Sequence, residues 1–173
     1  SMSTANIEEA TTSAPLRPRE QDAELQKVIE EFEHLGTVDN YNRVAAKVKP
    51  ISATSERLVC ELTIEAEHVN TKGTLHGGFS ASLVDIITAR AIGMTVKDKG
   101  MASVEIAVSY LLPVKRGETI TITATVLKIG RSLAFTDIEF RRADGKVAVK
   151  GKHTVAILPN DPPVTASGRV IQY

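Results

Sequence analysis

Residues 68–92 read HVNTKGTLHGGFSASLVDIITARAI, and this stretch decides the fold of the whole chain. From about Gly78 to Val96 it is long and mostly apolar, which predicts a buried helix. Its only ionisable side chains as far as Met94 are Asp85 and Arg90. Five residues of helix rotate Arg90 by about 140° from Asp85, so the two side chains cannot pair along the helix. The stretch therefore predicts a central helix that carries one isolated acid.

The segments around this helix alternate apolar and polar residues, which is typical of strands. Since a single internal helix cannot supply repeated βαβ crossovers, the sheet must be largely antiparallel. The predicted fold class is therefore α+β, with a curved antiparallel sheet wrapped around one long central helix. The predicted strands are 41–49, 56–65, 103–111, 118–129, 133–142 and 146–158, with turns around Pro50–Ser55 and at Asp144-Gly145. In strand 103–111, alternation places Val104, Ile106, Val108 and Tyr110 on one face and Ser103, Glu105, Ala107 and Ser109 on the other.

The chain divides into four parts. Residues 1–19 are polar and bear prolines, and are expected to form a disordered arm. Residues 20–40 are expected to hold an N-terminal helix that stops at Gly36, because apolar residues recur there at spacings of three and four. Residues 41–158 form the predicted domain, and 159–173 a C-terminal tail. The apolar stripe of the helix comprises Leu25, Val28, Ile29, Phe32 and Leu35.

Composition excludes several classes of function. Lysine plus arginine and aspartate plus glutamate number 21 each among 173 residues, so nucleic-acid binding is not expected. No apolar run approaches the roughly 20 residues that span a bilayer, and no signal-peptide pattern is evident, so we expect no membrane insertion and a cytoplasmic protein. One cysteine, Cys60, suits a reducing compartment and is expected to be an inert core thiol. With scattered histidines and this single cysteine, no metal site is expected.

Asp85 and the preceding His76-Gly77-Gly78 are the candidate chemistry. A buried carboxylate is costly unless it is hydrogen-bonded or hydrated, which would suit a general base; a solvent-facing aspartate or a helix–helix hydrogen bond is the alternative. Glycines at the start of a helix leave N–H groups free to bind a carbonyl, although a glycine pair can also be only a tight turn. Asp85 would lie about 10 Å further along the helix, too far for one chain to serve a single carbonyl. A twofold dimer with antiparallel helices would bring each Asp85 to the other chain's glycines.

Three segments resemble a known family: HVNTKGTLHGGFSASLVD (68–85), SVEIAVSYLLPVKRGE (103–118) and LKIGRSLAFTDIEF (127–140). They resemble the hotdog-fold acyl-CoA thioesterases of the phenylacetyl-CoA type, over roughly residues 40–157. The resemblance implies a hotdog fold and hydrolysis of medium- to long-chain fatty acyl-CoA, without a cofactor beyond the coenzyme A of the substrate. It also implies a homodimer, or a homotetramer built as a dimer of dimers, and mitochondrial association as an alternative to the cytoplasm.

The family's functional positions map onto this sequence residue by residue. Asn70 and the N–H of Gly77 would polarise the thioester carbonyl. Asp85 of the facing subunit would be the base for a water molecule that Ser103 orients; attack by Asp85 itself, through an anhydride, stays open. His76 would support the shape of the loop, with proton transfer as the alternative.

The resemblance also implies positions that contact the substrate and its coenzyme A. The charged ones could equally be ordinary solvated residues at strand ends, and His68 and His153 are expected to be structural or surface residues. The implied positions are Gly78, Glu105, Tyr110, Lys115, Lys128, Gly130, Arg131 and Ser132.

Two other functions remain for comparison. A hotdog enoyl-CoA hydratase would pair its carboxylate with a histidine, and the central helix has none. A non-catalytic acyl-CoA binder or scaffold would need neither Asn70, Asp85 nor Ser103.

Overall fold

The structure is a computed structural model that describes residues 18–159, so nearly all of the predicted arm and of the predicted tail lies outside the described residues. Two α-helices and six strands make up most of it. They are α1 (Pro18–His34), β1 (Lys49–Ala53), β2 (Arg57–Thr63), α2 (Gly77–Ile92), β3 (Gly100–Tyr110), β4 (Thr119–Ile129), β5 (Leu133–Arg141) and β6 (Val147–Leu158). Short 3-10 helices span Leu35–Thr37, Tyr41–Ala45 and Ala66–His68.

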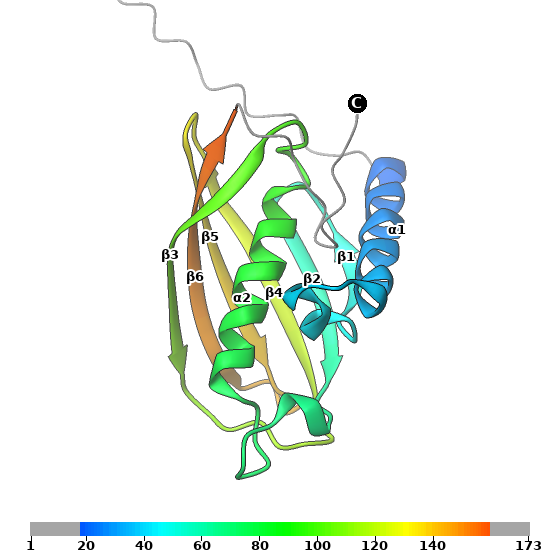
Figure 1. Ribbon diagram of the computed structural model, residues 1–173, viewed down its shortest axis with the longest axis vertical. Coiled ribbons are helices and arrows are strands. Elements are labelled where there is room, and N and C mark those ends of the chain that lie inside the picture. Colours follow the sequence, from blue (N-terminus) through cyan, green and yellow to red (C-terminus); the bar gives the residue numbers. More distant parts are fainter. Residues whose placement is uncertain (1–17, 160–173) are drawn as a thin grey trace, which may run out of the picture.

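All six strands form one sheet in the order β1-β2-β4-β5-β6-β3, and every neighbouring pair is antiparallel. The sheet curves around α2, while α1 lies beside β1 at one edge and β3 forms the opposite edge (Figure 1). The predicted α+β architecture with a wrapped central helix is therefore confirmed. None of the described helices is long and apolar enough to cross a membrane.

The core lies between α2 and the concave face of the sheet. Leu83 and Ile87 of α2 are fully buried, as are Ile120 and Ile122 of β4, because alternate residues of each strand point toward the helix. Cys60 is also fully buried, and this burial raises the pKa of its thiol to about 12. The prediction of an inert core thiol is confirmed, since a thiol with this pKa stays protonated at neutral pH.

Helix α1 belongs to the same core. Val28 and Phe32 of α1, and Leu35 directly after it, have no exposed surface and join the main cluster of buried side chains. Arg90 of α2 donates from Nε to Glu31 Oε2 of α1 at 2.8 Å. The N-terminal helix is thus part of the core and is ion-paired to the element that carries the candidate chemistry.

The predicted strand 41–49 is wrong. Residues Tyr41–Ala45 form a 3-10 helix, whose start is capped by the Asn40 side chain accepting from the N–H of Asn42. Strand β1 instead runs through Pro50, where a turn was predicted. A proline is tolerated there because β1 is an edge strand and needs no hydrogen bond on its outer side. Helix α2 also ends earlier than predicted, at Ile92 rather than near Val96. Residues 93–96 form single hydrogen-bonded turns instead.

The predicted faces of strand 103–111 are also wrong at one point. The register of β3 against β6 shifts between Ser103 and Glu105, which is a β-bulge. The extra residue, Val104, is 59% exposed. Ser103 therefore shares the helix-facing side with Ile106, instead of pointing away from it. This change of face is what brings the Ser103 hydroxyl to the inside of the sheet.

Candidate active site

The turn before α2 is organised by His76. Its ring Nδ1 accepts from the N–H of Gly78 at 2.9 Å and from that of Phe79 at 3.4 Å, so the imidazole caps the helix. Its backbone oxygen accepts from the N–H of Ser80 at 2.9 Å. Because Nδ1 acts as an acceptor, the proton of the neutral ring is on Nε2. The His76 ring therefore holds the first turn of α2 in place.

Gly77 leaves one hydrogen-bond donor free. Among the described residues its N–H has no hydrogen-bond partner, while its carbonyl accepts from the Tyr110 hydroxyl at 2.6 Å. A Cβ at position 77 would lie 3.3 Å from the Tyr110 ring, so only glycine fits under that ring without a shift. The N–H of Gly78, by contrast, is already bound to His76. Of the two glycines, Gly77 is the one that can donate to a ligand.

Asn70 is held in a turn by its own side chain. Its Oδ1 accepts from the N–H groups of Lys72 and Thr74 at 2.9 and 3.2 Å, and its Nδ2 donates to Thr74 Oγ1 at 3.0 Å. The second proton of Nδ2 is left for a ligand. Asn70, Gly77 and Tyr110 line one cavity of about 360 Å³ together with the loop 111–114. The structure therefore brings together two of the predicted carbonyl donors.

Asp85 lies two turns further along α2, on a partly buried surface, and does not line that cavity. It lies near a hydrogen-bonded chain from α2 to β3: Thr88 Oγ1 to His153 Nδ1 at 2.7 Å, and His153 Nε2 to Ser103 Oγ at 2.8 Å. Burial lowers the pKa of His153 below its usual 6.5, and the charge of nearby Asp85 acts in the opposite direction. Ser103, a further predicted residue, is thus bonded to a histidine whose pKa the charge of Asp85 also affects.

His153 is the functional candidate that the sequence analysis missed. It is 1% exposed and is held between α2 and β3, so it is structural as expected, but it also contacts a predicted site residue. Its alternation on β6 with Val155 and Ile157, which are both buried, could have indicated an inward side chain. The absence of a histidine from the central helix is therefore a weaker argument against hydratase chemistry than it seemed from the sequence, because β6 supplies one.

One chain holds these residues in two separate groups. We call Asn70, His76, Gly77, Gly78 and Tyr110 the glycine half-site, and Asp85, Thr88, Ser103 and His153 the aspartate half-site. Along β3, Tyr110 pairs with Val149 and Ser103 with Val155. At about 3.3 Å per residue, the seven steps from Ser103 to Tyr110, one of which is taken up by the bulge, span roughly 20 Å. The two half-sites of a single chain cannot act on the same atom.

The residues expected to contact coenzyme A are divided in the same way. Lys115 is exposed and its backbone bridges to Thr74, beside the glycine half-site. The turn 128–132 carries Lys128, Gly130, Arg131 and Ser132 between β4 and β5, at the opposite end of the sheet. The strand registers place this turn level with Ser103, because Val155 pairs with both Ser103 and Ala134. Glu105 is exposed directly after the bulge.

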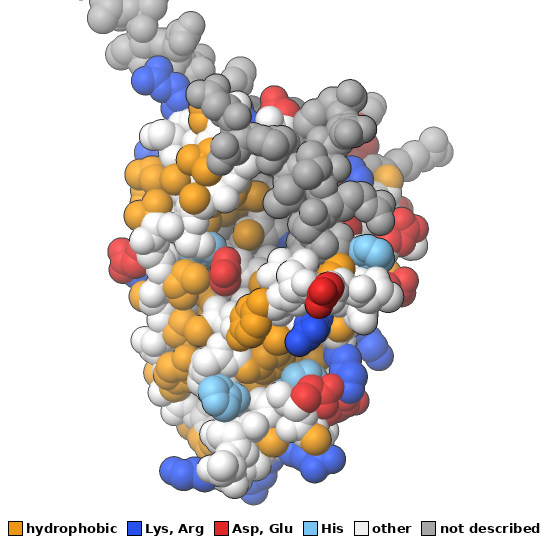
Figure 2. Space-filling view, in the orientation of Figure 1, with side chains coloured by type: hydrophobic (Ala, Val, Ile, Leu, Met, Phe, Trp, Pro, Cys, Tyr) orange, Lys and Arg blue, Asp and Glu red, His pale blue; other side chains and the backbone are white. Residues whose placement is uncertain are grey.

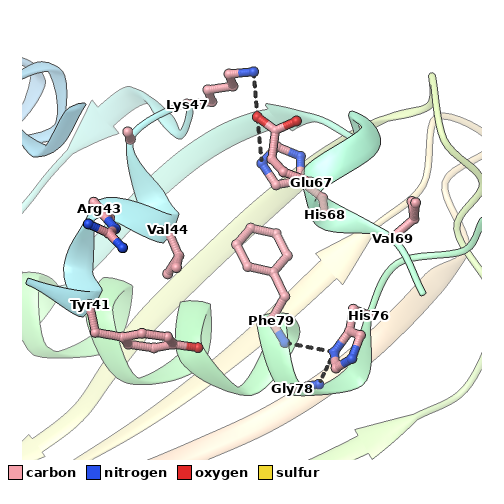
Figure 3. Close-up of a pocket in the computed structure, with 11 residues that line it drawn as sticks. Tyr41, Arg43, Val44, Lys47, Glu67, His68, Val69, His76, Gly78 and Phe79 are labelled. Carbon is pink, nitrogen blue, oxygen red and sulfur yellow. Dashed lines mark hydrogen bonds and ion pairs between the residues drawn. The ribbon is translucent and has the colours of Figure 1, made fainter. Parts of the chain in front are cut away.

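A second cavity of about 390 Å³ lies on the other side of the same turn (Figure 3). His68 stacks on Phe79 there, with ring centroids 4.7 Å apart. Burial lowers the pKa of His68, and its Nδ1 accepts from the N–H of Glu65 at 3.0 Å. Lys47, at the rim, forms ion pairs with Glu65 and Glu67. This histidine is structural, as expected from the sequence. No group of His, Cys, Asp and Glu within residues 18–159 could hold a metal ion.

The edge of the sheet at β3 is apolar and uncovered by other described elements. Val104, Tyr110 and Leu111 are 59%, 56% and 55% exposed. Hydrophobic side chains run along the side of the molecule where β3 lies (Figure 2). An open strand edge with such side chains is a typical protein–protein contact surface.

A single antiparallel sheet around a helix that begins at a glycine turn, with an acid two turns on, defines the hotdog class of enzymes. Comparison with known proteins agrees: the pattern of the thioesterase superfamily matches residues 72–149. The chain belongs to the thioesterase superfamily and is a thioester hydrolase.

Three relatives carry this assignment. A candidate esterase of Caenorhabditis elegans is 54% identical over 158 residues, which cover 91% of this chain and 93% of the relative. Human acyl-coenzyme A thioesterase 13 is 43% identical over 116 residues, covering 66% of this chain and 83% of the human protein. The crystal structure of zebrafish thioesterase superfamily member 2 has a TM-score of 0.74 at 38% identity, covering 77% of this chain and 97% of that one.

Proposed function

We propose that this protein hydrolyses fatty acyl-CoA thioesters at a site shared by two subunits, in which the glycine half-site of one chain meets the aspartate half-site of its partner. The observation that carries the proposal is the division of the site. The free N–H of Gly77 lies about 12 Å from Asp85 along α2 and farther still from Ser103, so one chain cannot complete the reaction. The human relative named above, an acyl-coenzyme A thioesterase, supports the choice of substrate.

The carbonyl of the substrate would accept hydrogen bonds from the N–H of Gly77 and from Asn70 Nδ2. Both donors become stronger partners as the carbonyl oxygen gains negative charge, and each such donor is typically worth about 3 kcal/mol of the barrier. The partner's Asp85 would take a proton from water while the water oxygen bonds to the carbonyl carbon. The intermediate then expels the coenzyme A thiolate, the C–S bond breaks, and the proton passes from Asp85 to solvent or sulfur.

Ser103 would orient the attacking water. Its hydroxyl is fixed by His153, which is fixed in turn by Thr88, so the whole chain of hydrogen bonds is anchored in α2. Thr88 Oγ1 also donates to the carbonyl of Val84 at 2.6 Å, which leaves its lone pair for the histidine. A serine held in this way has a defined direction in which to bind water.

The subunits would pair along the open edge of β3. An antiparallel β3–β3 contact with its twofold axis near Ile106 and Ala107 would place Ser103 opposite the partner's Tyr110. That register joins the two kinds of half-site twice, once on each side of the axis. It also joins Lys115 of one chain to the turn 128–132 of the other, which would gather cations for the phosphates of coenzyme A.

Two further features of the assembly and the substrate are part of the proposal. Leu133 and Phe135 are exposed on the outer face of the sheet and would join two dimers into a tetramer. The cavity of the glycine half-site is lined by Leu75, Leu111, Leu112 and Val114, which suits a medium- to long-chain acyl group.

The decisive experiment is a thiol-release assay with a series of acyl-CoA chain lengths. Asp85→Asn should lower kcat by about 100- to 10,000-fold, because it removes the base and keeps the shape of the side chain. Asp98→Asn, in the exposed loop after α2, is the matched control and should keep full activity. Full turnover by Asp85→Asn would remove this residue from the reaction.

The proximity of His153 to Asp85 makes enoyl-CoA hydration the second function to test. The same preparations should be offered crotonyl-CoA. Hydration of its double bond without release of thiol would replace the hydrolase proposal with that of a hydratase.

A further inference from the structure

Tyr110 makes a contact that does not involve coenzyme A. Its hydroxyl donates to the carbonyl of Gly77 at 2.6 Å, and its ring lies 3.3 Å from where a Cβ of residue 77 would be. We propose that Tyr110 is a positioning residue for hydrolysis, which fixes the place of Gly77, and therefore of its free N–H, relative to the edge of the sheet. This inference rests on the proposed function and adds a role at the same site.

The backbone on both sides of Gly77 is held by hydrogen bonds. The carbonyl of His76, in the peptide unit before Gly77, accepts from the N–H of Ser80 at 2.9 Å and from its hydroxyl at 3.2 Å. In the peptide unit after Gly77, the carbonyl is bound by Tyr110 and the N–H of Gly78 by the His76 ring. Glycine has the widest backbone freedom of any residue, so these contacts determine its orientation.

These contacts leave a single donor for a substrate. The Gly77 N–H is opposite the His76 carbonyl in a planar peptide unit, so its direction is fixed once that carbonyl is bound. The peptide unit after Gly77 shares the Cα of Gly77, so a shift of this unit would also move the N–H donor. An oxyanion donor is effective only when it is already oriented before the reaction. Keeping Gly77 in place through this second unit should therefore lower the barrier to hydrolysis.

Tyr110 supplies the one restraint that comes from outside α2 and its cap. It is the last residue of β3, where it pairs with Val149, and the next residue, Leu111, donates from its N–H to the carbonyl of Ala148 at 2.8 Å. The phenol is thus mounted on the sheet rather than on a free loop. Through the hydrogen bond of the phenol to Gly77, the edge of the sheet fixes the position of the glycine turn.

Tyr110→Phe tests the inference because it removes only the hydroxyl and keeps the ring over Gly77. A positioning role predicts that kcat falls about 10- to 100-fold while KM for acyl-CoA stays within about twofold. The affinity for free coenzyme A should not change. The same fractional loss should appear with a p-nitrophenyl ester of the same acyl group, since that substrate has no coenzyme A. Tyr110→Phe should also shift the amide NMR signals of Gly77 and Gly78.

Tyr41→Phe is the matched control. Its hydroxyl also bonds to α2, at Ser82 Oγ with 2.8 Å, but not to Gly77, so kcat should stay at the wild-type value. A loss in Tyr110→Phe that appears as a higher KM and only with acyl-CoA would overturn positioning in favour of a coenzyme A contact. Unchanged kcat with both substrates would overturn it outright. Failure of the proposed function looks different, because the wild type itself would then release no thiol from acyl-CoA.

Discussion

At the scale of single residues, the buried hydrogen bonds of His153 depend on one hydroxyl. Thr88 is fully buried and bonds to His153 Nδ1 at 2.7 Å. Thr88→Val keeps the shape of the side chain but leaves that nitrogen without a partner, which should lower the free energy of unfolding by about 1–3 kcal/mol. Urea unfolding would measure this. Thr88→Ser keeps the hydroxyl and should lose less; an equal or larger loss in Thr88→Ser would contradict the role of the hydrogen bond.

Two buried histidines should make stability depend on pH. Burial lowers the pKa of both His68 and His153 below the 6.5 of an exposed imidazole. Below pH 6.5 the unfolded chain therefore takes up protons that the folded chain still refuses, so the free energy of unfolding should fall as the pH drops. This contribution is fully present above pH 6.5 and is lost as the pH falls through the pKa values of the folded state. Denaturant titrations at several pH values should show a shallower fall in His68→Gln and His153→Gln, and identical slopes would refute this account.

The site residues that could be predicted from sequence are those whose environment is local. Asp85 stands out because its neighbours on one helix are apolar, and Gly77 because a glycine pair precedes that helix. His153 and the Tyr110 hydroxyl were not predictable in their roles, because their partners lie 65 and 33 residues away. Their positions depend on how strands pair, which a local pattern does not contain.

At the scale of elements, α1 should contribute to the stability of the whole domain. Phe32 is fully buried between α1 and the rest of the core. Phe32→Ala should lower the free energy of unfolding by about 3–5 kcal/mol, since it removes a large buried side chain and leaves a cavity. Glu33→Ala, on the exposed side of the same helix, should change it by less than about 0.5 kcal/mol. Equal effects of the two substitutions in chemical unfolding would show that α1 is not part of the core.

Strand and helix periodicity identified α1, α2 and five of the six strands, because each is long enough to show its period. The failures have physical causes. The alternation over 41–49 is too short to distinguish a strand from a 3-10 helix that begins after Asn40. Strand β1 was missed because its proline, Pro50, is typical of a turn in the sequence. The face of Ser103 depends on a bulge that inserts one residue, and every side chain before the bulge then changes sides relative to those after it.

At the scale of the whole molecule, a shared site predicts complementation between inactive variants. Asn70→Asp keeps the oxygen that holds the turn but removes the carbonyl donor, and Asp85→Asn removes the base. After subunit exchange, mixed dimers would have one intact site, so the mixture should recover about a quarter of wild-type activity. A thiol-release assay before and after exchange measures this. A mixture that stays inactive would show that each site is built from one chain.

The exposed edge of β3 should determine the oligomeric state. Val104→Lys places a charge on this apolar edge and should shift the protein toward the 18.6 kDa monomer in light scattering, with parallel loss of activity. Lys150→Glu, on the exposed surface of β6, is a control for a change of charge and should keep the oligomer. A fully active monomer of either variant would contradict the pairing of the subunits.

The two borders of the sheet are unequal, and this limits how far copies of the protein can add to one another. At β1 the backbone offers a proline in place of one donor, and α1 lies against the strand. Among the described strands, only the border at β3 is open to a further strand. A second molecule that pairs there in a twofold arrangement therefore occupies the open edge of both molecules. Growth by strand addition then stops at two chains, which protects a concentrated solution of this protein from forming fibres by that route.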